Sequence, residues 1–217
     1  MTPCRWRYDG VVPYGEAVLR QKDLVRRRIE KRIPDTLLFV EHPHVITLGK
    51  VARPEHLVAA RPGVEVVRTE RGGDITYHGP GQVVGYPIVD LGELRQDVKW
   101  YVGRLEEVMI RAVARHGIRA GREERMTGVW TGGRKIGAIG VRVERWVTSH
   151  GFALNAATDL SYFDQIIPCG LQGKAVTSLA EETGRAVDLE ALRRALAEEF
   201  GEVFGRAMSY DPESQGR

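Results

Sequence analysis

The sequence predicts an α/β (α+β) protein in which one mixed β-sheet is flanked by helices. Short runs of apolar and β-branched residues alternate irregularly with longer amphipathic patterns of helical period. The short runs outnumber the helical patterns, which favours a mixed sheet over a doubly wound parallel sheet. A length of 217 residues with 42% hydrophobic content fits a single domain, which we expect over residues 1–208, followed by a flexible tail at 209–217.

The first half of the chain predicts a helix followed by several strands. Apolar residues at three-to-four spacing over residues 14–32 indicate an amphipathic helix. Strand-like runs follow at residues 37–40, 45–48, 64–68 and 83–89, and the last two flank a glycine-rich segment. We expect the inward face of the helix to consist of Val18, Leu24, Val25 and Ile29.

The second half predicts two more helices around a pair of strands. Residues 96–116 show a long helical pattern that Gly117 can end, and residues 136–144 and 145–155 read as paired strands. Asp188 can cap a last helix by accepting hydrogen bonds from its first backbone amides. The apolar stripes of these helices are Tyr101, Leu105, Val108, Met109 and Ala112, and Leu189, Leu192, Leu196 and Phe200.

Composition excludes several classes of protein. The net charge of +3 is too small to indicate nucleic-acid binding, and no apolar stretch approaches the roughly 18 residues of a membrane span. The first residues lack the apolar core of a signal peptide, so we expect a cytoplasmic protein whose cysteines, Cys4 and Cys169, are reduced. A basic cluster on the first helix is either a solvated face or a docking site for an acidic protein. This cluster consists of Arg26, Arg27, Arg28, Lys31 and Arg32.

The most informative segment is R-G-G-D-I-T-Y-H-G-P-G-Q at residues 71–82. Its glycines permit positive φ and a close backbone approach to a bound group, and Pro80 between two glycines fixes a turn. Tyr77 and His78 inside such a segment indicate a ligand-binding loop, because a plain surface turn more often carries Ser, Asn or Lys. The alternative is a solvated turn between two strands.

Cys169 lies in the segment I-I-P-C-G at residues 166–170. Pro168 restricts φ and Gly170 permits unusual backbone angles, so the pattern indicates a thiol presented at a rigid turn. The alternative is a small cysteine packed in the core, which would need neither neighbour.

Lys135 is notable because this chain uses arginine as its ordinary cation, with 26 arginines against 6 lysines. It lies in G-G-R-K-I-G-A-I-G-V-R-V at residues 132–143, before an apolar run that would carry it into the interior. A desolvated lysine can lose its proton, whereas arginine cannot. A close pair of Cys169 and Lys135 can therefore share a proton, with the thiolate as nucleophile. The alternative is a surface lysine at a strand end.

Five motifs follow one another along the chain. They are the 71–82 segment, G-V-W at residues 128–130, K-I-G-A-I-G-V-R-V at 135–143, W-V-T-S-H-G-F-A-L-N at 146–155, and I-P-C-G at 167–170. In this order and at this spacing they resemble the lipoyl(octanoyl) transferase family, over residues 37–179. The resemblance implies the α/β fold that this family shares with biotin protein ligases and lipoate ligases.

The resemblance also implies a reaction and its residues. An octanoyl group would pass from the phosphopantetheine thioester of acyl carrier protein to a lysine of a lipoyl domain, without ATP or a metal. The implied acceptors are the lipoyl domains of 2-oxoacid dehydrogenase complexes and the glycine-cleavage H protein. Cys169 matches the nucleophile that carries the acyl thioester, and Lys135 matches the lysine that lowers its pKa and shuttles protons. The substrate-binding segments match Arg71, Gly72, Gly73, Asp74, Ile75, Thr76, Tyr77 and His78, then Ala138, Ile139 and Gly140, and then Gly151, Phe152 and Ala153.

This reaction agrees with elementary chemistry. A thioester is already activated, so exchange onto a cysteine is nearly balanced and aminolysis to an amide runs downhill without a nucleotide. We expect an apolar slot for the acyl chain, each buried methylene contributing about 0.8 kcal/mol. The residues expected to line this slot are Ile136, Ala138, Ile139 and Phe152.

Three other functions stay open at this point. An adenylating lipoate or biotin ligase would share the fold, although the sequence has no P-loop and such a reaction gives Cys169 no role. A cysteine hydrolase would need a histidine base, for which His78 and His150 are candidates. A zinc module would use His42, His44, His78 or Cys169, but the sequence has neither H-E-x-x-H nor C-x-x-C.

Overall fold

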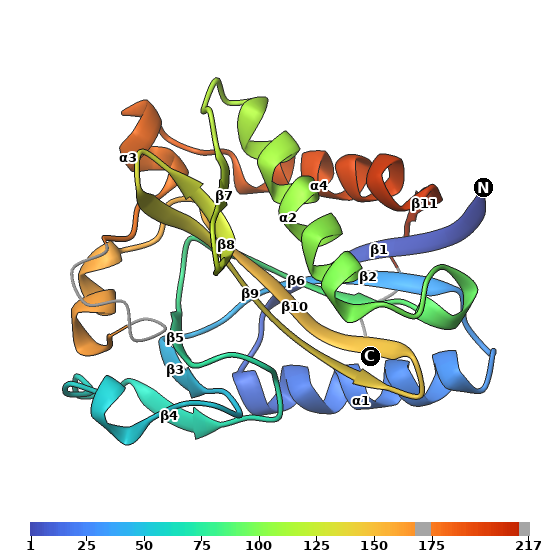
Figure 1. Ribbon diagram of the computed structural model, residues 1–217, viewed down its shortest axis with the longest axis horizontal. Helices are drawn as coiled ribbons and strands as arrows, with labels where there is room; N and C mark the ends of the chain where they lie inside the picture. Colours follow the sequence, from blue (N-terminus) through green and yellow to red (C-terminus); the bar gives the residue numbers. More distant parts are fainter. Residues whose placement is uncertain (168–174, 213–217) are drawn as a thin grey trace.

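The computed structural model describes residues 1–167 and 175–212 (Figure 1). Within them the main feature is an eight-stranded mixed sheet with the order β11-β1-β2-β6-β10-β9-β8-β7. β1 pairs in parallel with β2 and with β11, and every other pair in this sheet is antiparallel. The strands are β1 (Thr2–Val11), β2 (Asp35–Glu41), β6 (Gln82–Ile88), β7 (Gly121–Glu123), β8 (Met126–Thr131), β9 (Arg134–Glu144), β10 (Val147–Asn155) and β11 (Arg206–Tyr210).

A second, three-stranded sheet lies on one side of the large sheet. Its order is β4-β3-β5, with β3 parallel to β4 and antiparallel to β5. Figure 1 shows this small sheet beside α1, while α2 and α4 lie together on the opposite side of the large sheet. The remaining elements are β3 (Val45–Leu48), β4 (Glu65–Arg68), β5 (Ile75–His78), α1 (Tyr14–Ile29), α2 (Val98–Ala114), α3 (Leu179–Thr183), α4 (Leu189–Phe204) and the short 3-10 helices η1 (Pro54–His56), η2 (Leu91–Glu93) and η3 (Leu160–Gln165).

Each layer is held by its own apolar cluster. The largest lies between the large sheet and the α2 and α4 helices, and includes Leu105, Met109 and Phe200. A second cluster lies between α1 and the other face of the large sheet, and the third packs the small sheet against η3. The predicted mixed sheet flanked by helices is therefore confirmed.

The predicted helices form close to their expected bounds. Asp188 accepts hydrogen bonds from the backbone amides of Glu190 and Ala191, so it caps α4 as expected. α1 ends at Ile29 rather than at residue 32, and Lys31 then takes a φ of 60° that lies outside the helical range. The paired strands expected from residues 136–155 are confirmed as the antiparallel β9–β10 hairpin.

β1 and β11 are not among the predicted strands, and the prediction of a flexible tail from residue 209 is wrong at its first two residues. Ser209 and Tyr210 belong to β11, where they pair with Arg5 and Trp6 of β1. β1 does carry a signal, because the alternate residues Cys4, Trp6 and Tyr8 contact the large apolar cluster. This signal is weak, because Arg5 and Arg7 at the intervening positions break up the apolar run. Residues 213–217 lie outside the described part of the chain.

The basic cluster of the first helix does not form one exposed face. Arg28 is buried and donates to Asp35 through Nε at 2.9 Å and to Glu93 through Nη2 at 2.6 Å. Lys31 binds Asp90 and Glu93, each at 2.5 Å. The interpretation of Arg28 as a solvated or docking residue is therefore wrong, because folding buries it and brings carboxylates from two later segments, β2 and the η2 turn, to Arg28 and Lys31.

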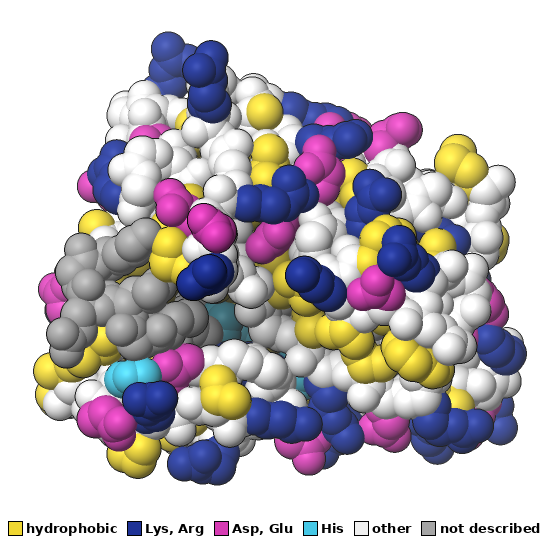
Figure 2. Space-filling model, in the orientation of Figure 1, with side chains coloured by type: hydrophobic (Ala, Val, Ile, Leu, Met, Phe, Trp, Pro, Cys, Tyr) yellow, Lys and Arg dark blue, Asp and Glu magenta, His cyan; other side chains and the backbone are white. Residues whose placement is uncertain are grey.

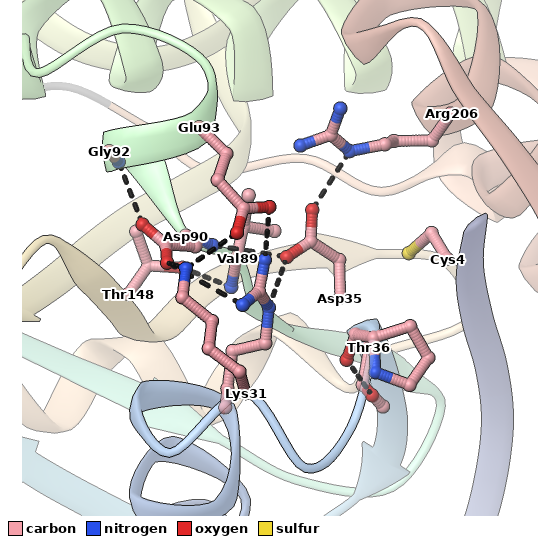
Figure 3. A network of polar contacts seen from close by, with 12 residues as sticks. Cys4, Lys31, Asp35, Thr36, Val89, Asp90, Gly92, Glu93, Thr148 and Arg206 are labelled. Atoms are coloured by element: carbon pink, nitrogen blue, oxygen red, sulfur yellow. Dashed lines mark hydrogen bonds and ion pairs between the residues drawn. The ribbon is translucent and has the colours of Figure 1, made fainter. Parts of the chain in front are cut away.

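These residues form an ionic network that joins α1, β2, the η2 turn and β11 (Figure 3). Asp35 is at its centre: it accepts from Arg28 Nε, from Arg206 Nε at 2.8 Å and from the backbone amide of Asp90 at 3.1 Å. Cys4 lies beside Asp35, and burial followed by the charge of Asp35 raises the pKa of its thiol. The network consists of Arg28, Lys31, Asp35, Asp90, Glu93 and Arg206.

The surface agrees with the small net charge. Figure 2 shows Lys and Arg side chains mixed with Asp and Glu across the visible face rather than gathered into one stripe. In the described residues, none of the helices combines the length and the apolar character needed to span a bilayer.

Candidate functional site

A cavity of about 830 Å³, the main cavity, lies where the β9–β10 hairpin faces the small sheet and the segment before β5. Lys135 and Val176 line one part of it, and Tyr14, Tyr86 and His150 line another. Small residues on the paired strands leave space between these parts, since Ala138 of β9 is the register partner of Ala153 of β10. Of the predicted substrate-binding residues, the following line this cavity: Arg71, Gly72, Gly73, Asp74, Ile75, Thr76, His78, Ala138, Ile139, Gly140, Gly151, Phe152 and Ala153.

The segment before β5 is held tightly against the edge of β9. The Gly72 amide donates to the Val141 carbonyl at 2.9 Å. A Cβ on Gly140 would lie 2.9 Å from the Gly72 carbonyl, so Gly140 allows this close approach. Gly49 is equally constrained, because a Cβ there would lie 2.1 Å from the Gly73 carbonyl. Glycines on both sides of each contact therefore allow the backbone of residues 72–73 to lie close to Gly49 and Gly140. Residues 71–74, which line the cavity here, are called the glycine wall.

Arg71 is buried and orders the same wall. Its Nη2 donates to the Thr47 carbonyl at 2.7 Å and to Thr47 Oγ1 at 2.9 Å, while Nε reaches the same hydroxyl at 3.2 Å. Its Nη1 donates to the Gly72 carbonyl at 3.1 Å. The guanidinium thus joins β3 to the start of the glycine segment and keeps a positive charge beside the cavity.

Tyr77 does not face the main cavity, and the prediction that residues 71–82 form one loop is wrong. Residues 75–78 form strand β5, whose alternation turns Thr76 and His78 to the cavity and Tyr77 away from it. Tyr77 is fully buried and contacts Tyr162 and Phe163 in the cluster under the small sheet. His44 belongs to the same side, because its Nδ1 is 2.7 Å from the Tyr77 hydroxyl.

Ile136 also differs from expectation, since it packs in the large apolar cluster under α2 rather than in the slot. The register of β8 and β9 explains this. Val129 pairs with Gly137 and Trp130 with Lys135, so Ile136 is an extra residue without a partner on β8. The bulge sends Ile136 into the core and leaves Lys135 and Ala138 on the cavity side.

Lys135 is buried at the start of β9 and enclosed by its neighbours. Its Nζ lies 5.2 Å from the centre of the Trp130 ring. A Cβ on Gly128 would lie 2.6 Å from Lys135 Cε and 3.3 Å from Nζ, so glycine makes room for the amine. The prediction that the apolar run carries this lysine inside is confirmed, and the surface-lysine alternative is wrong.

Cys169 lies outside the described residues, and so does the turn predicted around it. The described residues on either side of this segment are at the cavity. The Ile167 amide donates to the carbonyl of His56, a lining residue, at 2.8 Å. The Lys135 amide donates to the Ala175 carbonyl at 3.0 Å, and the Thr177 amide donates to the Lys135 carbonyl at 2.9 Å.

Two buried histidines, His78 and His150, line the far part of the cavity, and a third buried histidine, His42, contacts His78. Burial lowers the pKa of His42 to about 4 and that of His150 to about 4, and burial with the neighbouring His42 lowers the pKa of His78 to about 3. They are therefore neutral at neutral pH. His42 is fully engaged, with Nδ1 2.6 Å from the Val12 carbonyl and Nε2 2.7 Å from the Tyr86 hydroxyl.

His78 begins a chain of hydrogen bonds that reaches Lys135. His78 Nδ1 is 2.7 Å from Gln82 Oε1, Gln82 Nε2 donates to Asn155 Oδ1 at 2.9 Å, and Asn155 Nδ2 donates to the Thr177 carbonyl at 3.0 Å. Thr177 is the residue whose amide binds the Lys135 carbonyl. The chain connects β5, β6, β10 and the segment after residue 174.

Several lining residues are not among the predicted site residues, for example Tyr14, Gln82, Tyr86 and Asn155. The sequence predicts only a helix at Tyr14 and a strand at Tyr86, whereas Gln82 ends the glycine-rich segment and Asn155 ends the motif at residues 146–155. A polar residue inside an apolar strand pattern, such as Gln82 or the single asparagine Asn155, was the available signal.

Comparison with known proteins now bears on this site. The family model for the lipoyl protein ligase A/B catalytic domain matches residues 13–201. The chain belongs to this family. It is 47% identical to an octanoyltransferase of Solibacter usitatus over 97% of this chain and 96% of that protein. It is 49% identical to an octanoyltransferase of Gloeobacter violaceus over 94% of this chain and 92% of that protein. The resemblance to the octanoyltransferase family is confirmed, and so is the enzyme class, an acyltransferase.

Solved structures show the same fold at low identity. Lipoate-protein ligase A bound with ATP has a TM-score of 0.78 and 16% identity, with 99% of this chain and 91% of that chain covered. A bi-partite lipoate protein ligase from Thermoplasma acidophilum has a TM-score of 0.77 and 16% identity, with 99% and 89% covered. A biotin protein ligase from Aquifex aeolicus has a TM-score of 0.54 and 13% identity, with 94% and 70% covered. The fold predicted from the resemblance is therefore confirmed.

Proposed function

We propose that this enzyme transfers an octanoyl group from octanoyl-acyl carrier protein to a specific lysine of a lipoyl domain, through a thioester on Cys169. The observation that carries this proposal is the buried amine of Lys135 on a cavity that both flanks of the Cys169 segment adjoin. Membership of the lipoyl protein ligase A/B family supports it. We place the reaction in the cytoplasm, with lipoyl domains of 2-oxoacid dehydrogenase complexes and the glycine-cleavage H protein as acceptors.

The reaction runs in two balanced steps. In the first, the Cys169 sulfur forms a bond to the acyl carbon, the bond to the pantetheine sulfur breaks, and the thiol proton passes through Lys135 to the leaving thiolate. In the second, the acceptor amine attacks the acyl carbon, the bond to Cys169 breaks, and the proton of the amine returns through Lys135 to Cys169. Neither step requires ATP or a metal ion, because the donor thioester supplies the activated carbonyl.

The residues around the cavity support the substrate assignment. Ala138 and Ala153 leave an apolar passage next to Lys135, while Ile139 and Phe152 add apolar lining. His42 is a poor zinc ligand here, because a backbone carbonyl and a tyrosine hydroxyl already occupy its two nitrogens.

Intact-protein mass spectrometry tests the proposal. Incubation with octanoyl-acyl carrier protein should add one octanoyl group to the enzyme, and a lipoyl domain should then remove it and gain the same mass, without ATP. Cys169→Ala should abolish both the adduct and the transfer. Cys4→Ala is the matched control and should keep both, because Cys4 is buried beside Asp35.

Three outcomes would contradict the proposal. An adduct retained in Cys169→Ala would remove the nucleophile from Cys169. A strict requirement for ATP would favour an adenylating ligase, and steady release of free octanoate without an acceptor would favour a hydrolase.

A further inference from the structure

Transfer of the acyl group to a lysine releases a proton that Lys135 does not carry. Aminolysis needs a neutral amine, but a lysine side chain, with an unperturbed pKa of about 10.4, is an ammonium ion at neutral pH. One proton must therefore leave the acceptor nitrogen before its lone pair can form a bond to the acyl carbon. Lys135 exchanges a different proton, the one that passes to the Cys169 sulfur when the thioester breaks. The acceptor step therefore needs a second base.

His56 of η1 and Asp74 form a hydrogen-bonded dyad on the main cavity. His56 Nδ1 lies 2.6 Å from Asp74 Oδ2, and both residues line the cavity. Asp74 Oδ1 accepts from the Ile75 amide at 2.7 Å, so the carboxylate is fixed at the start of β5. A carboxylate only accepts hydrogen bonds, so it favours the tautomer with the proton on His56 Nδ1 and leaves the Nε2 lone pair as the basic site. Among the described residues, none hydrogen-bonds Nε2.

The chain that leads to Cys169 is attached to this dyad. The His56 carbonyl accepts from the amide of Ile167, which is two residues before Cys169 in the sequence, at 2.8 Å. On the other side, the Lys135 amide donates to the Ala175 carbonyl at 3.0 Å. The described flanks of the Cys169 segment are thus held by His56 at one end and by Lys135 at the other.

The other basic groups on the cavity are less suited to this role. Burial lowers the pKa of His78 to about 3 and that of His150 to about 4, so neither takes up a proton at neutral pH. Arginine side chains stay protonated and cannot accept a proton. The side chains of His56 and Asp74 are 13% and 11% exposed, so the dyad is shielded by the protein and still reaches water.

We propose that His56 is the base that takes the proton from the acceptor lysine, and that Asp74 positions its ring. This inference rests on the proposed octanoyl transfer. His56 Nε2 takes one proton from the ammonium group, and the nitrogen lone pair forms the bond to the acyl carbon. The bond to Cys169 breaks, and the second proton lost by the nitrogen passes through Lys135 to the sulfur. The imidazolium of His56 then gives its proton to water.

Thioester exchange with the donor needs no such base, because the thiol proton ends on the leaving thiolate. Removal of His56 should therefore slow the second step and spare the first. His56→Gln deletes the ring and keeps an amide that can donate to Asp74. Asp74→Asn keeps the ring but presents an NH₂ group to Nδ1, which favours the tautomer with the proton on Nε2. His116→Gln is the matched control, because His116 follows α2 and is not among the described residues that line the cavity.

Single-turnover kinetics measures the two steps separately. Intact mass gives the rate at which octanoyl-acyl carrier protein acylates the enzyme, and the acyl-enzyme is then mixed with increasing concentrations of a lipoyl domain. In His56→Gln and Asp74→Asn we expect the maximal transfer rate to fall at least about tenfold, since a positioned base contributes roughly a hundredfold or more and water replaces it in part. The acylation rate and the concentration of lipoyl domain at half-maximal rate should stay near their wild-type values. His116→Gln should keep all three values.

A second acceptor separates a base from a docking residue. In S-(2-aminoethyl)cysteine the sulfur atom makes the amine a weaker base than that of lysine, so a larger fraction is already neutral. With a lipoyl domain that carries this residue in place of the acceptor lysine, the loss in both variants should be smaller than with the lysine domain. A docking or purely structural role predicts the same loss for both acceptors.

Wild-type transfer rates in both His56→Gln and Asp74→Asn would overturn the base assignment and leave octanoyl transfer in place. An equal loss with the two acceptors, or an equal loss in the acylation rate, would also overturn it. A wild-type enzyme that forms no adduct with octanoyl-acyl carrier protein would instead overturn the proposed function.

Discussion

The ionic network of Figure 3 and the histidine-lined end of the main cavity are both buried and polar, yet they are built differently. In the network each charge meets an opposite charge, and Asp35 receives two guanidinium groups and a backbone amide. At this end of the cavity His78 and His150 are neutral, because burial lowers their pKa values. Opposite charges that pair with one another hold elements together, whereas neutral lining groups can face an apolar ligand without separating a buried ion pair.

The largest effect should come from breaking the network at its centre. Asp35→Asn removes the charge that faces Arg28 and Arg206, and leaving buried cations uncompensated should lower the free energy of unfolding by about 3–5 kcal/mol. Denaturant unfolding measures this loss. Glu93→Gln is the control: its side chain is partly exposed, so we expect a loss of about 1 kcal/mol or less. Equal losses in the two variants would show that burial of the network does not matter.

Catalytic activity should fall when Lys135 is replaced by arginine, although the positive charge is preserved. Lys135→Arg should reduce adduct formation and transfer at least about tenfold, and approach the roughly hundredfold loss expected when a positioned acid or base is removed, as in Lys135→Ala. Arginine keeps the positive charge but cannot pass a proton. Single-turnover kinetics measures both steps, with unfolding curves as the stability control.

Chemical rescue tests whether Lys135→Arg loses activity because arginine cannot pass a proton or because its side chain is too large for the site. Gly128 leaves little space beside Lys135, so arginine could fail by size alone. A small primary amine should restore part of the activity of Lys135→Ala, and guanidinium at the same concentration should not. Rescue by both, or near-wild-type turnover of Lys135→Arg, would reduce Lys135 to an electrostatic partner.

The glycine wall should affect activity more than stability. Gly72→Val should lower kcat/KM at least about tenfold, because a side chain there meets the Val141 carbonyl, 3.2 Å from the Cβ position, and would push the wall away from β9. We expect the free energy of unfolding to change by about 1 kcal/mol. Gly121→Val is the control, since a Cβ there meets no atom within 4 Å. A wild-type kcat/KM in Gly72→Val would make residues 71–74 an ordinary turn.

Acid should also distinguish the two regions, because the histidines and the carboxylates of the network titrate at different pH. His42, His78 and His150 have folded pKa values near 4, 3 and 4, below the roughly 6.5 of an unfolded histidine. Between these values the unfolded chain binds more protons, so stability should fall as the pH falls from about 6.5 toward 4, by up to about 1.4 kcal/mol per pH unit for each histidine. The pKa of Glu93 is lowered by its bonds to Lys31 and Arg28, so the network loses stability only at lower pH, where carboxylates protonate.

Unfolding curves at pH 5 and pH 7 measure this difference. His42→Asn should flatten the dependence between these two values, even if it lowers stability at both. An unchanged slope in His42→Asn would show that this histidine is not held neutral by the fold.

Local patterns were enough to predict much of the molecule. The stripe over residues 98–114 and the cap at Asp188 depend on neighbours within one or two turns, so α2 and α4 follow from sequence alone. The β9–β10 hairpin follows from two adjacent apolar runs. The unusual lysine at position 135 was also visible, because an arginine-rich chain rarely uses lysine.

Tertiary structure decided where several of the important side chains point. Alternation is a local rule, and it is broken by the bulge at Ile136 and by the positive φ of His150, both of which depend on strands paired across the sheet. The basic run on α1 was equally ambiguous, because Asp90, Glu93 and Arg206, which pair with it or with Asp35, come from distant parts of the chain. The sequence therefore predicts which residues carry the chemistry, because residue types and motifs are local, whereas long-range packing determines which described residues meet at the cavity and which pair with one another.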